Sequence, residues 1–419
     1  MKQSLLVTKT RKVVNAQEVS SNAQLLERAG YISKLMSGAY SYLPLGLRVL
    51  SRIERIVREA MNELGAQEIL MPALQPREPW DVTGRWEQFD VMYKIKAGDR
   101  DLCLGPTHEE IVTPLIGGYI SSYKDLPRAV YQIQTKFRNE ARPKSGLLRG
   151  REFRMKDLYS FHATEDDLNS YFEKVRQAYM AIFRRCGLGD ITYYTYASGG
   201  AFTQYSHEFQ TVTPSGEDTV FVCEGCFIAI NQEVRASMLQ CPECGADAFT
   251  EHKAIEVGNI FKLMYRFSDA FGITYSDPQN AQQPVPMGCY GLGTSRLMGA
   301  VVEALHDDKG IVWPLDIAPF SVHLISLARK PETVARAHEL YEQLTHEGFD
   351  VLFDERDGCT AGEKFADADL IGIPVRLVFS EKTAEQSSVE YKKRTEVEAS
   401  LITLPELSDF LKSKGLLRS

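Results

Sequence analysis

The spacing of apolar residues predicts a long helix near the start of the chain. Between Leu47 and Leu64 they recur every three or four positions, which gathers them into one stripe on a helix. Gly65 is a natural end for that helix, and a short strand over residues 68–71 follows, ending at Pro72. One interpretation of this pattern is an ordinary core helix and strand without a functional role; a second, functional interpretation is given below.

Two more helices are predicted from the same kind of pattern. Residues 165–185 carry an apolar face formed by Leu168, Phe172, Val175, Tyr179 and Phe183. Another helix starts in the stretch 105–110, where Thr107 and Glu110 have the spacing of a capping box. That local role leaves Glu109 unexplained.

The pattern changes after residues 313–319, a stretch with two prolines that we interpret as a linker. Strands are predicted over 321–327, 351–353 and 375–379, and helices over 331–346 and 362–370, with a closing helix from a capping box at Thr403–Glu406. This alternation predicts a small α/β domain over 320–419 with a parallel or mixed sheet. Residues 1–312 then form the first domain.

Composition narrows the function classes. The chain has 419 residues, 44% of them hydrophobic and 25% charged, and no apolar run of membrane-spanning length, so we expect a cytosolic protein without a membrane partner. The net charge of −8 argues against broad nucleic-acid affinity and against DNA as a partner. A local basic stripe can still contact RNA.

One segment departs from that acidic balance. Residues 135–156 hold eight Lys or Arg and two Glu, a local charge of +6. Arg138 and Glu140 end one extended segment, a loop with Pro143 and Gly146 follows, and Arg149 to Phe153 opens a second. Two strands joined by a basic loop suit a polyphosphate, because the planar guanidinium pairs with two oxygens at once. The alternative is a solvated surface hairpin.

Two further patterns carry chemistry. Cys223 and Cys226 form one Cys-x-x-Cys pair, and Cys241 and Cys244 form another after fourteen residues, which predicts a closed four-thiolate structural zinc site. Free buried thiols or a redox pair remain alternatives. The glycine-rich stretch 287–296 enters a helix, but Arg296 stands where a dinucleotide fingerprint has its third glycine and no βαβ unit precedes it.

Together these stretches resemble the class II aminoacyl-tRNA synthetases. The resemblance makes 135–157 motif 2, in which Arg138 binds the α-phosphate of ATP, Glu140 the adenine amino group and Arg149 the γ-phosphate, while Phe153 stacks on adenine. It makes 287–296 motif 3, with Arg296 on the γ-phosphate, and it implies Mg²⁺ bridging the phosphates. The helix and strand before Pro72 resemble motif 1, which implies a homodimer.

The block from Pro106 to Glu110 resembles the bacterial-type prolyl-tRNA synthetases more closely. The resemblance implies that Thr107, Glu109 and Arg138 bind proline and that Phe161, His162 and Cys289 line its pocket. A structural His162 and a merely small, buried Cys289 are the alternatives. The chain departs from the family at Asn259, where His is common, and at Met264 and Tyr265, which replace Gly-Thr.

The blocks 354–356, 364–374 and 389–394 resemble the anticodon-binding domain of this group, which implies tRNA(Pro) as partner. Arg356 and Lys364 are the residues we expect to contact the anticodon. The expected fold is therefore an α+β catalytic domain with an antiparallel sheet, a small zinc-ribbon-like insertion over 221–250 and the C-terminal α/β domain.

The short gap between the cysteine pairs carries a functional expectation. Many relatives have an editing domain of a hundred or more residues there, so the resemblance implies ATP-dependent prolyl transfer without hydrolysis of alanyl-tRNA(Pro) in cis. Arg138, Arg149 and Arg296 would be the electrostatic catalysts. A class II synthetase for another small amino acid and a catalytically silent tRNA-binding paralogue remain alternatives.

Overall fold

The computed structural model describes residues 1–13, 20–199 and 205–417. The chain forms two compact units. One consists of Met1–Lys34, Tyr40–Arg52 and Val301–Ser419, and the other of Leu35–Ala39 and Ile53–Ala300. The segment expected to begin the catalytic domain therefore packs within the unit that contains the C-terminal domain.

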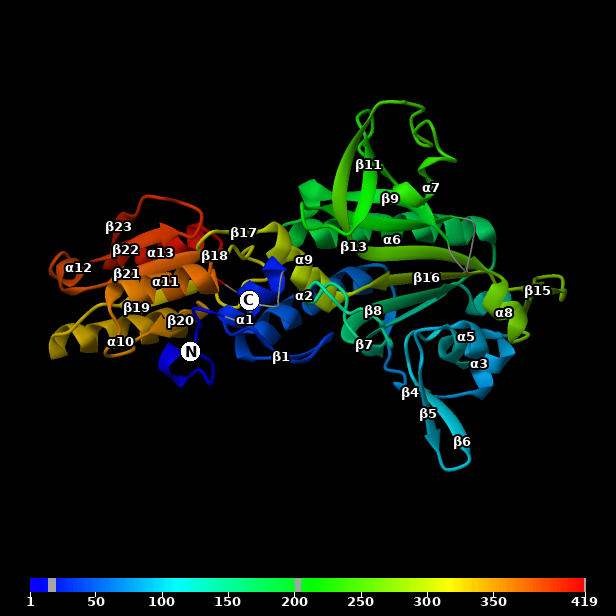
Figure 1. Ribbon diagram of the computed structural model, residues 1–419, viewed down its shortest axis with the longest axis horizontal. Helices are drawn as coiled ribbons and strands as arrows, with labels where there is room; N and C mark the ends of the chain where they lie inside the picture. Colours follow the sequence, from blue (N-terminus) through cyan, green and yellow to red (C-terminus); the bar gives the residue numbers. More distant parts are fainter. Residues whose placement is uncertain (14–19, 200–204, 418–419) are drawn as a thin grey trace. The chain divides into compact units, whose positions relative to one another are not determined.

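The larger unit is built on a nine-stranded sheet with the order β10-β9-β12-β11-β13-β16-β8-β7-β3 (Figure 1). Its strands are β3 (Gln67–Glu68), β7 (Arg128–Phe137), β8 (Glu152–Phe161), β9 (Thr192–Ser198), β10 (Tyr205–Val212), β11 (Asp218–Cys223), β12 (Ala229–Asn231), β13 (Phe249–Met264) and β16 (Met287–Leu292). The central strands β13, β16, β8 and β7 pair antiparallel, as expected. Only β3 joins this centre in parallel.

Two of the predicted helices frame this sheet. Helix α6 (Glu165–Arg185) has the predicted bounds, buries the predicted apolar face and lies along β13 and β16. Helix α2 (Pro44–Glu63) begins three residues earlier than predicted. The predicted strand after it is shorter, because only Gln67 and Glu68 pair with the edge of β7.

A small layer beside the sheet holds the segment between α2 and β7. It contains β4 (Leu74–Pro76), α3 (Glu78–Val82), α4 (Arg85–Gln88), β5 (Tyr93–Ala97), β6 (Arg100–Leu104), α5 (Glu109–Gly117) and the 3-10 turn η2 (Tyr123–Asp125). The capping box predicted at Thr107 is wrong. Helix α5 is preceded by His108, and Thr107 bonds to Glu109 while Glu110 bonds to Thr83 and Arg85. The side chains of Thr107 and Glu110 therefore bond to other residues and do not cap the helix.

The cysteine-containing segment projects from the sheet at β11, β12, α7 (Gln232–Arg235) and the start of β13 (Figure 1). At the other end of β13 the strand is irregular, and Met264 has a φ of 52°. That is the left-handed region, which favours glycine. The family's usual glycine at this position thus has a physical explanation, and the chain keeps the geometry without it.

The remaining elements of this part of the chain are short or connect the sheet to its helices: α8 (Arg266–Ala270), β14 (Thr274–Ser276), β15 (Gln282–Pro284) and α9 (Thr294–Ala304). Among the described residues, no helix has the length and apolar character needed to cross a bilayer.

The smaller unit contains a five-stranded mixed sheet with the order β20-β19-β21-β22-β23. Its elements are β19 (Val322–Ser326), α10 (Pro331–His346), β20 (Val351–Asp354), α11 (Ala361–Ile371), β21 (Val375–Phe379), α12 (Glu381–Glu385), β22 (Ser388–Lys393), β23 (Ser400–Thr403) and α13 (Leu404–Ser413). The predicted alternation of strand and helix is confirmed. The antiparallel strands β22 and β23 were not predicted.

Further elements complete this unit: η1 (Gln3–Leu5), α1 (Ser21–Arg28) and, after α9, the β17–β18 hairpin (His306–Asp307, Gly310–Ile311). The β1–β2 hairpin (Ile32–Met36, Ala39–Tyr42) is divided, because its residues Leu35–Ala39 belong to the larger unit. Lys2 bridges to Phe353 at the edge of β20, and the buried side chain of Gln3 bonds to His323 at 2.8 Å. The first residues therefore cover one edge of the C-terminal sheet, which explains their place in this unit.

Candidate active site

The basic segment forms the turn between the two central strands β7 and β8. The backbone N–H of Arg138, directly after β7, donates to the carbonyl of Arg151 at 2.8 Å. The guanidinium carbon of Arg138 lies 5.2 Å from the ring centre of Phe153, at the start of β8. Burial leaves Nε of Arg138 without a hydrogen-bond partner among the described residues, so this donor is available to a ligand.

One cavity of about 280 Å³ opens beside this turn, and we call it the basic cavity. Its lining includes Arg138, Glu140, Arg149, Phe153 and Arg296, so the structure gathers all five residues expected to bind ATP. Arg149 forms an ion pair with Glu140 at 2.9 Å, and Arg296 forms one with Glu256 at 2.9 Å. The Arg149 side chain is 48% exposed, so solvent screens its charge.

Carboxylates also line the basic cavity. Asp218 and Glu256 belong to its wall, opposite in charge to the three arginines. Carboxylate oxygens are the protein ligands that Mg²⁺ prefers, usually one or two of them beside substrate phosphates. This donor set fits the magnesium ion that the family resemblance implies.

A second cavity of about 290 Å³ adjoins the first, and we call it the acidic pocket. It shares Arg138, Phe153, Glu256 and Arg296 with the basic cavity. Thr107, Glu109 and Cys289 line its other side, as expected for an amino-acid site. Arg138 therefore faces a space where a small amino acid and the phosphates of a nucleotide could meet.

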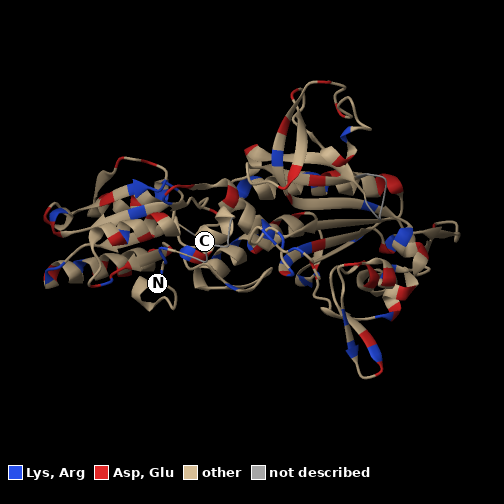
Figure 2. Ribbon diagram, viewed as in Figure 1, with Lys and Arg blue, Asp and Glu red and all other residues tan. Residues whose placement is uncertain are grey.

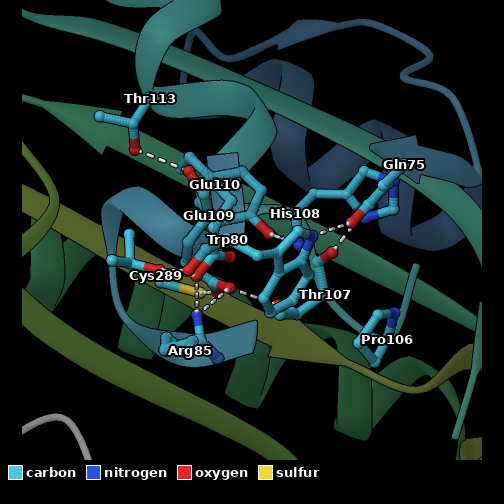
Figure 3. A network of polar contacts seen from close by, with 12 residues as sticks. Gln75, Trp80, Arg85, Pro106, Thr107, His108, Glu109, Glu110, Thr113 and Cys289 are labelled. Atoms are coloured by element: carbon cyan, nitrogen blue, oxygen red, sulfur yellow. Dashed lines mark hydrogen bonds and ion pairs between the residues drawn. The ribbon is translucent and has the colours of Figure 1, made fainter. Parts of the chain in front are cut away.

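Glu109 is the buried centre of the acidic pocket (Figure 3). The Thr107 hydroxyl donates to its Oε2 at 2.5 Å, the Cys289 thiol donates to its Oε1 at 3.2 Å, and Nη1 of Arg85 lies 3.4 Å from Oε2. Burial alone raises the pKa of a carboxyl group, but the Arg85 charge and these hydrogen bonds outweigh it and hold the pKa of Glu109 below its usual value. Glu109 is thus a carboxylate at neutral pH, as a cationic ligand requires.

A row of buried polar residues lies behind the pocket. Lys136 forms an ion pair with Asp157 at 2.8 Å and donates to Nδ1 of His108 at 2.6 Å. Burial and the Lys136 charge lower the pKa of His108 to about 4, so the ring is neutral and can accept that bond. This row fixes Asp157, which lines the pocket, and His108, which neighbours Glu109.

Phe161 and His162 do not belong to the lining of either cavity, and their expected place in the proline pocket stays a prediction. Side chains alternate along β8, so Phe161 faces the same side as the lining residues Asp157 and Tyr159. It stands beyond Tyr159, packed in the apolar core with Met287. The Nδ1–H of His162 donates to the Asp167 carboxylate, 2.7 Å away.

Sequence reasoning missed several lining residues. Arg85, Phe89 and Val91 line the acidic pocket from a segment without any recognised motif. Asn259 was not missed: the sequence marks it as a departure from the family, and it lines the pocket from β13. The chain therefore departs from the family, at Asn259, in a residue that borders the acidic pocket. The sequence around Arg85 gave only a weak indication of a functional role, a single arginine after Gly84.

The four cysteines converge as predicted. The sulfur atoms of Cys223, Cys226, Cys241 and Cys244 all lie within 4.8 Å of one another, with pairs at 3.6 Å and 3.4 Å. A tetrahedral site with Zn–S bonds of about 2.3 Å has sulfur atoms about 3.8 Å apart. The geometry therefore fits a four-thiolate zinc site.

Arg356 and Lys364 line a separate cavity of about 450 Å³ in the smaller unit. It lies at the carboxyl ends of the parallel strands β19 and β20, the usual ligand-binding edge of such sheets. Arg356 pairs with Asp354 and Asp367. Lys364 is buried and donates to the carbonyl of Ser326 at 2.8 Å, so its ammonium supports the cavity wall.

Family comparisons agree with this arrangement. Residues 93–305 match the family described as tRNA synthetase class II core domain (G, H, P, S and T), and residues 317–414 match the family described as anticodon binding domain. The fold and the site are therefore those of a class II aminoacyl-tRNA synthetase.

Curated relatives give the particular family. A proline–tRNA ligase of Dehalococcoides mccartyi (strain CBDB1) is 32% identical over 557 aligned positions, covering 97% of this chain and 98% of the relative. One from Geobacillus sp. (strain WCH70) is 34% identical, covering 98% and 99%. The chain belongs to the prolyl-tRNA synthetases, which are aminoacyl-tRNA ligases.

Solved structures share the fold. A Cryptosporidium parvum prolyl-tRNA synthetase complexed with L-proline and AMP superposes with a TM-score of 0.76 at 18% identity, covering 94% of this chain and 74% of the other. A Giardia lamblia prolyl-tRNA synthetase in complex with prolyl-adenylate gives 0.75 at 21% identity, covering 92% and 74%.

Proposed function

We propose that the chain activates proline with ATP and transfers it to the 3′ end of tRNA(Pro), using the two adjoining cavities as one active site. The observation that carries this proposal is Arg138, which lines both cavities and keeps a buried, unpaired Nε. A residue at that junction can touch the α-phosphate and the attacking carboxylate together.

In the first step a carboxylate oxygen of proline bonds to the α-phosphorus, and the bond from that phosphorus to the pyrophosphate oxygen breaks. Negative charge grows on the α-phosphoryl oxygens, and Arg138 stabilises it. Arg149 and Arg296 bind the outer phosphates, which leave as pyrophosphate, while Glu140 and Phe153 hold the adenine. Asp218 and Glu256 would hold Mg²⁺, and that ion would supply further neutralisation of the phosphate charge.

In the second step the terminal ribose hydroxyl of the tRNA bonds to the carbonyl carbon of the adenylate, and AMP leaves. No protein nucleophile is needed, because positioning and charge stabilisation suffice. Thr107 and Glu109 hold the secondary ammonium of proline, whose two N–H bonds match one hydroxyl and one carboxylate. The Cys289 thiol bonds to the same carboxylate and borders the ring of the substrate.

Amino-acid-dependent exchange of pyrophosphate into ATP tests this proposal with the purified full chain. We expect exchange with proline and not with glycine, serine or threonine. Exchange with one of those instead would make the chain a class II synthetase for another small amino acid, and no exchange with any would favour the silent tRNA-binding alternative.

The cysteine cluster is proposed to hold a structural Zn²⁺. Four thiolates close the coordination sphere, so the ion has no open position for substrate. Purified protein should contain one zinc per chain, and Cys241→Ser should lower both zinc content and thermal stability. Cys359→Ser, in the other unit, is the matched control. A zinc-free sample that is fully folded would refute this site.

We further propose that the chain lacks cis editing. At least 138 of the 557 positions aligned with the Dehalococcoides relative have no residue of this chain opposite them, because the chain has only 419. A hydrophobic pocket rejects a smaller substrate by only about 1–3 kcal/mol per missing methylene, and alanine lacks two of the ring carbons of proline. Alanyl-tRNA(Pro) should therefore form slowly and persist; its hydrolysis by the purified chain would contradict this.

The remaining parts of the proposal concern partners. The cavity at β19 and β20 would receive the anticodon, with Arg356 at its rim and Lys364 in its wall. Figure 2 shows Lys and Arg interspersed with Asp and Glu on most elements, which suits local contacts to one RNA and not general affinity for nucleic acid. A homodimer through the motif 1 segment and a cytoplasmic location complete the proposal.

A further inference from the structure

Among the described residues, Arg85 is the one cation that bridges Glu109 and Glu110, the two consecutive carboxylates of the Thr-His-Glu-Glu block. Its Nη1 lies 2.8 Å from Oε1 of Glu110 and 3.4 Å from Oε2 of Glu109. Figure 3 shows the guanidinium facing Glu109 beside Cys289, on the side of the pocket. Arg85 also lines the acidic pocket itself.

The surroundings of Arg85 make this contact costly to lose. Its side chain is 5% exposed, and its guanidinium carbon lies 5.3 Å from the ring centre of Trp80, 4.9 Å from that of Phe89 and 5.5 Å from that of Phe267. A charge this deep in apolar surroundings persists only when it is paired. The aromatic faces favour the cation and fix its direction.

We infer that Arg85 is a positioning residue of the amino-acid site: it holds Glu109 in the ionised form and in the orientation that receives the secondary ammonium of the substrate. The inference rests on the proposed function, since it assigns Glu109 to that ammonium. Arg85 acts through Glu109 and through the wall formed by its own helix α4, so it is distinct from the residues that meet the phosphates.

The two carboxylates respond differently to the shared cation. Burial and the neighbouring Glu109 charge raise the pKa of Glu110 to about 7, whereas the pKa of Glu109 is held below its usual value. The single guanidinium of Arg85 thus keeps Glu109 ionised but does not keep Glu110 fully ionised at neutral pH. Other ionisable groups that face this pair from neighbouring elements are Lys136, Arg138, His108, Asp157, Tyr159 and Cys289.

Removing the cation should have a distinctive signature. In Arg85→Gln, burial again dominates at Glu109, whose pKa rises toward neutrality. The KM for proline should then rise on the order of 10- to 100-fold while the KM for ATP stays within about twofold. The kcat/KM for proline should fall as pH is lowered from 8 to 6, a decline absent from the unmodified protein.

Arg77→Gln is the matched control. Arg77 lies just before α3, pairs with Asp81 and Asp101 at the surface and has a guanidinium 5.5 Å from the ring centre of Trp86. It shares the residue type and an aromatic neighbour with Arg85 but lies outside the pocket lining. Proline and ATP kinetics of this variant should match those of the unmodified protein.

Two further variants guard against a folding defect. Arg85→Lys keeps a cation that can serve one carboxylate, so the KM for proline should rise less. Arg85→Gln combined with Glu110→Gln leaves no second carboxylate to compete, so this double variant should bind proline better than Arg85→Gln alone. A purely structural role predicts the opposite, since two damaged positions would add.

The measurements separate the inference from the proposed function. An unmodified chain that is active with proline, with Arg85→Gln behaving like Arg77→Gln, overturns the role of Arg85 alone. Equal increases in both KM values overturn it too. If Arg85→Gln does not fold, the other two variants decide. The proposed role of Arg85 is overturned when Arg85→Lys and the double variant both have the proline KM of the unmodified protein. An unmodified chain that is inactive with proline overturns both proposals.

Discussion

The two cavities of the larger unit have nearly the same volume and share Arg138, yet they manage charge in opposite ways. In the acidic pocket, Arg85 and Glu109 are almost fully buried and already paired. In the basic cavity, Arg149, which does not line the acidic pocket, keeps a side-chain exposure of 48% although it has a carboxylate partner. A small, fixed amino acid suits the first arrangement, and a hydrated triphosphate that arrives and leaves suits the second.

The comparison teaches that burial sets how much each residue should matter. A buried charge that loses its partner carries an uncompensated desolvation cost, whereas a half-exposed charge is screened by water. Substitutions should therefore rank by their place in the two cavities.

Arg138→Gln should have the largest effect, because Arg138 lines both cavities and, unlike Arg149 and Arg296, has a buried Nε without a hydrogen-bond partner among the described residues. We expect proline-dependent pyrophosphate exchange to fall about 1000-fold, the cost of losing a fixed donor at developing charge. The KM values for proline and ATP should both rise. A loss confined to one substrate would mean that the cavities do not meet at this side chain.

Glu109→Gln should come next and should separate the cavities. The isosteric amide keeps the hydrogen bond from Thr107 but removes the charge for the substrate ammonium. The kcat/KM for proline should fall about 100-fold, with the KM for ATP unchanged. Glu87→Gln, whose side chain is 73% exposed, is the control. An equal effect on ATP would contradict the assignment of the pocket.

Arg149→Ala should have a smaller effect. Because half of its side chain is in solvent, we expect about a tenfold rise in the KM for ATP and none for proline. The difference from the unmodified protein should shrink as salt is added, since screening weakens exposed charges first. An effect as large as that of Arg138→Gln would break the proposed contrast between buried and exposed charge.

The same contrast explains what the sequence could and could not predict. The residues of the basic cavity lie in two dense motifs, so Arg138, Glu140, Arg149, Phe153 and Arg296 could be chosen together from the sequence. Arg85 could not, because its meaning depends on a tertiary contact with residues 24 and 25 positions away. Spacing along the chain carries no information on such a pair.

The fold followed a similar rule. Helices with a complete apolar stripe, such as α6 and α10, were predicted with the observed bounds. The capping box at Thr107 failed, since Thr107 bonds to Glu109, and Glu110 bonds to the distant Thr83 and Arg85 in place of the helix terminus. The expected role of Phe161 rested on the family resemblance, and strand alternation adds only the face of a residue, not its depth along that face.

The smallest predicted effect concerns a buried ionisable group whose charged neighbours have the wrong sign. His207 on β10 stacks against Tyr194, with ring centres 4.9 Å apart. Burial, with the charges of Lys262 and Arg176, lowers its pKa to about 4. Arg85 has carboxylate partners that stabilise its charge, whereas His207 has only cationic neighbours, so the His207 ring stays neutral in the fold.

The sign of the pH effect follows from that neutrality. The unfolded chain binds a proton at His207 near pH 6.5, whereas the folded chain does so only near pH 4, so stability is lost as pH falls through this window. His207→Phe keeps an aromatic ring and removes the proton site. The loss in unfolding free energy between pH 7.5 and pH 5, measured by denaturant titration, should be about 2 kcal/mol smaller in the variant. An identical loss in both proteins would mean that His207 is protonated within the fold, and that burial without an opposite charge does not neutralise a group here.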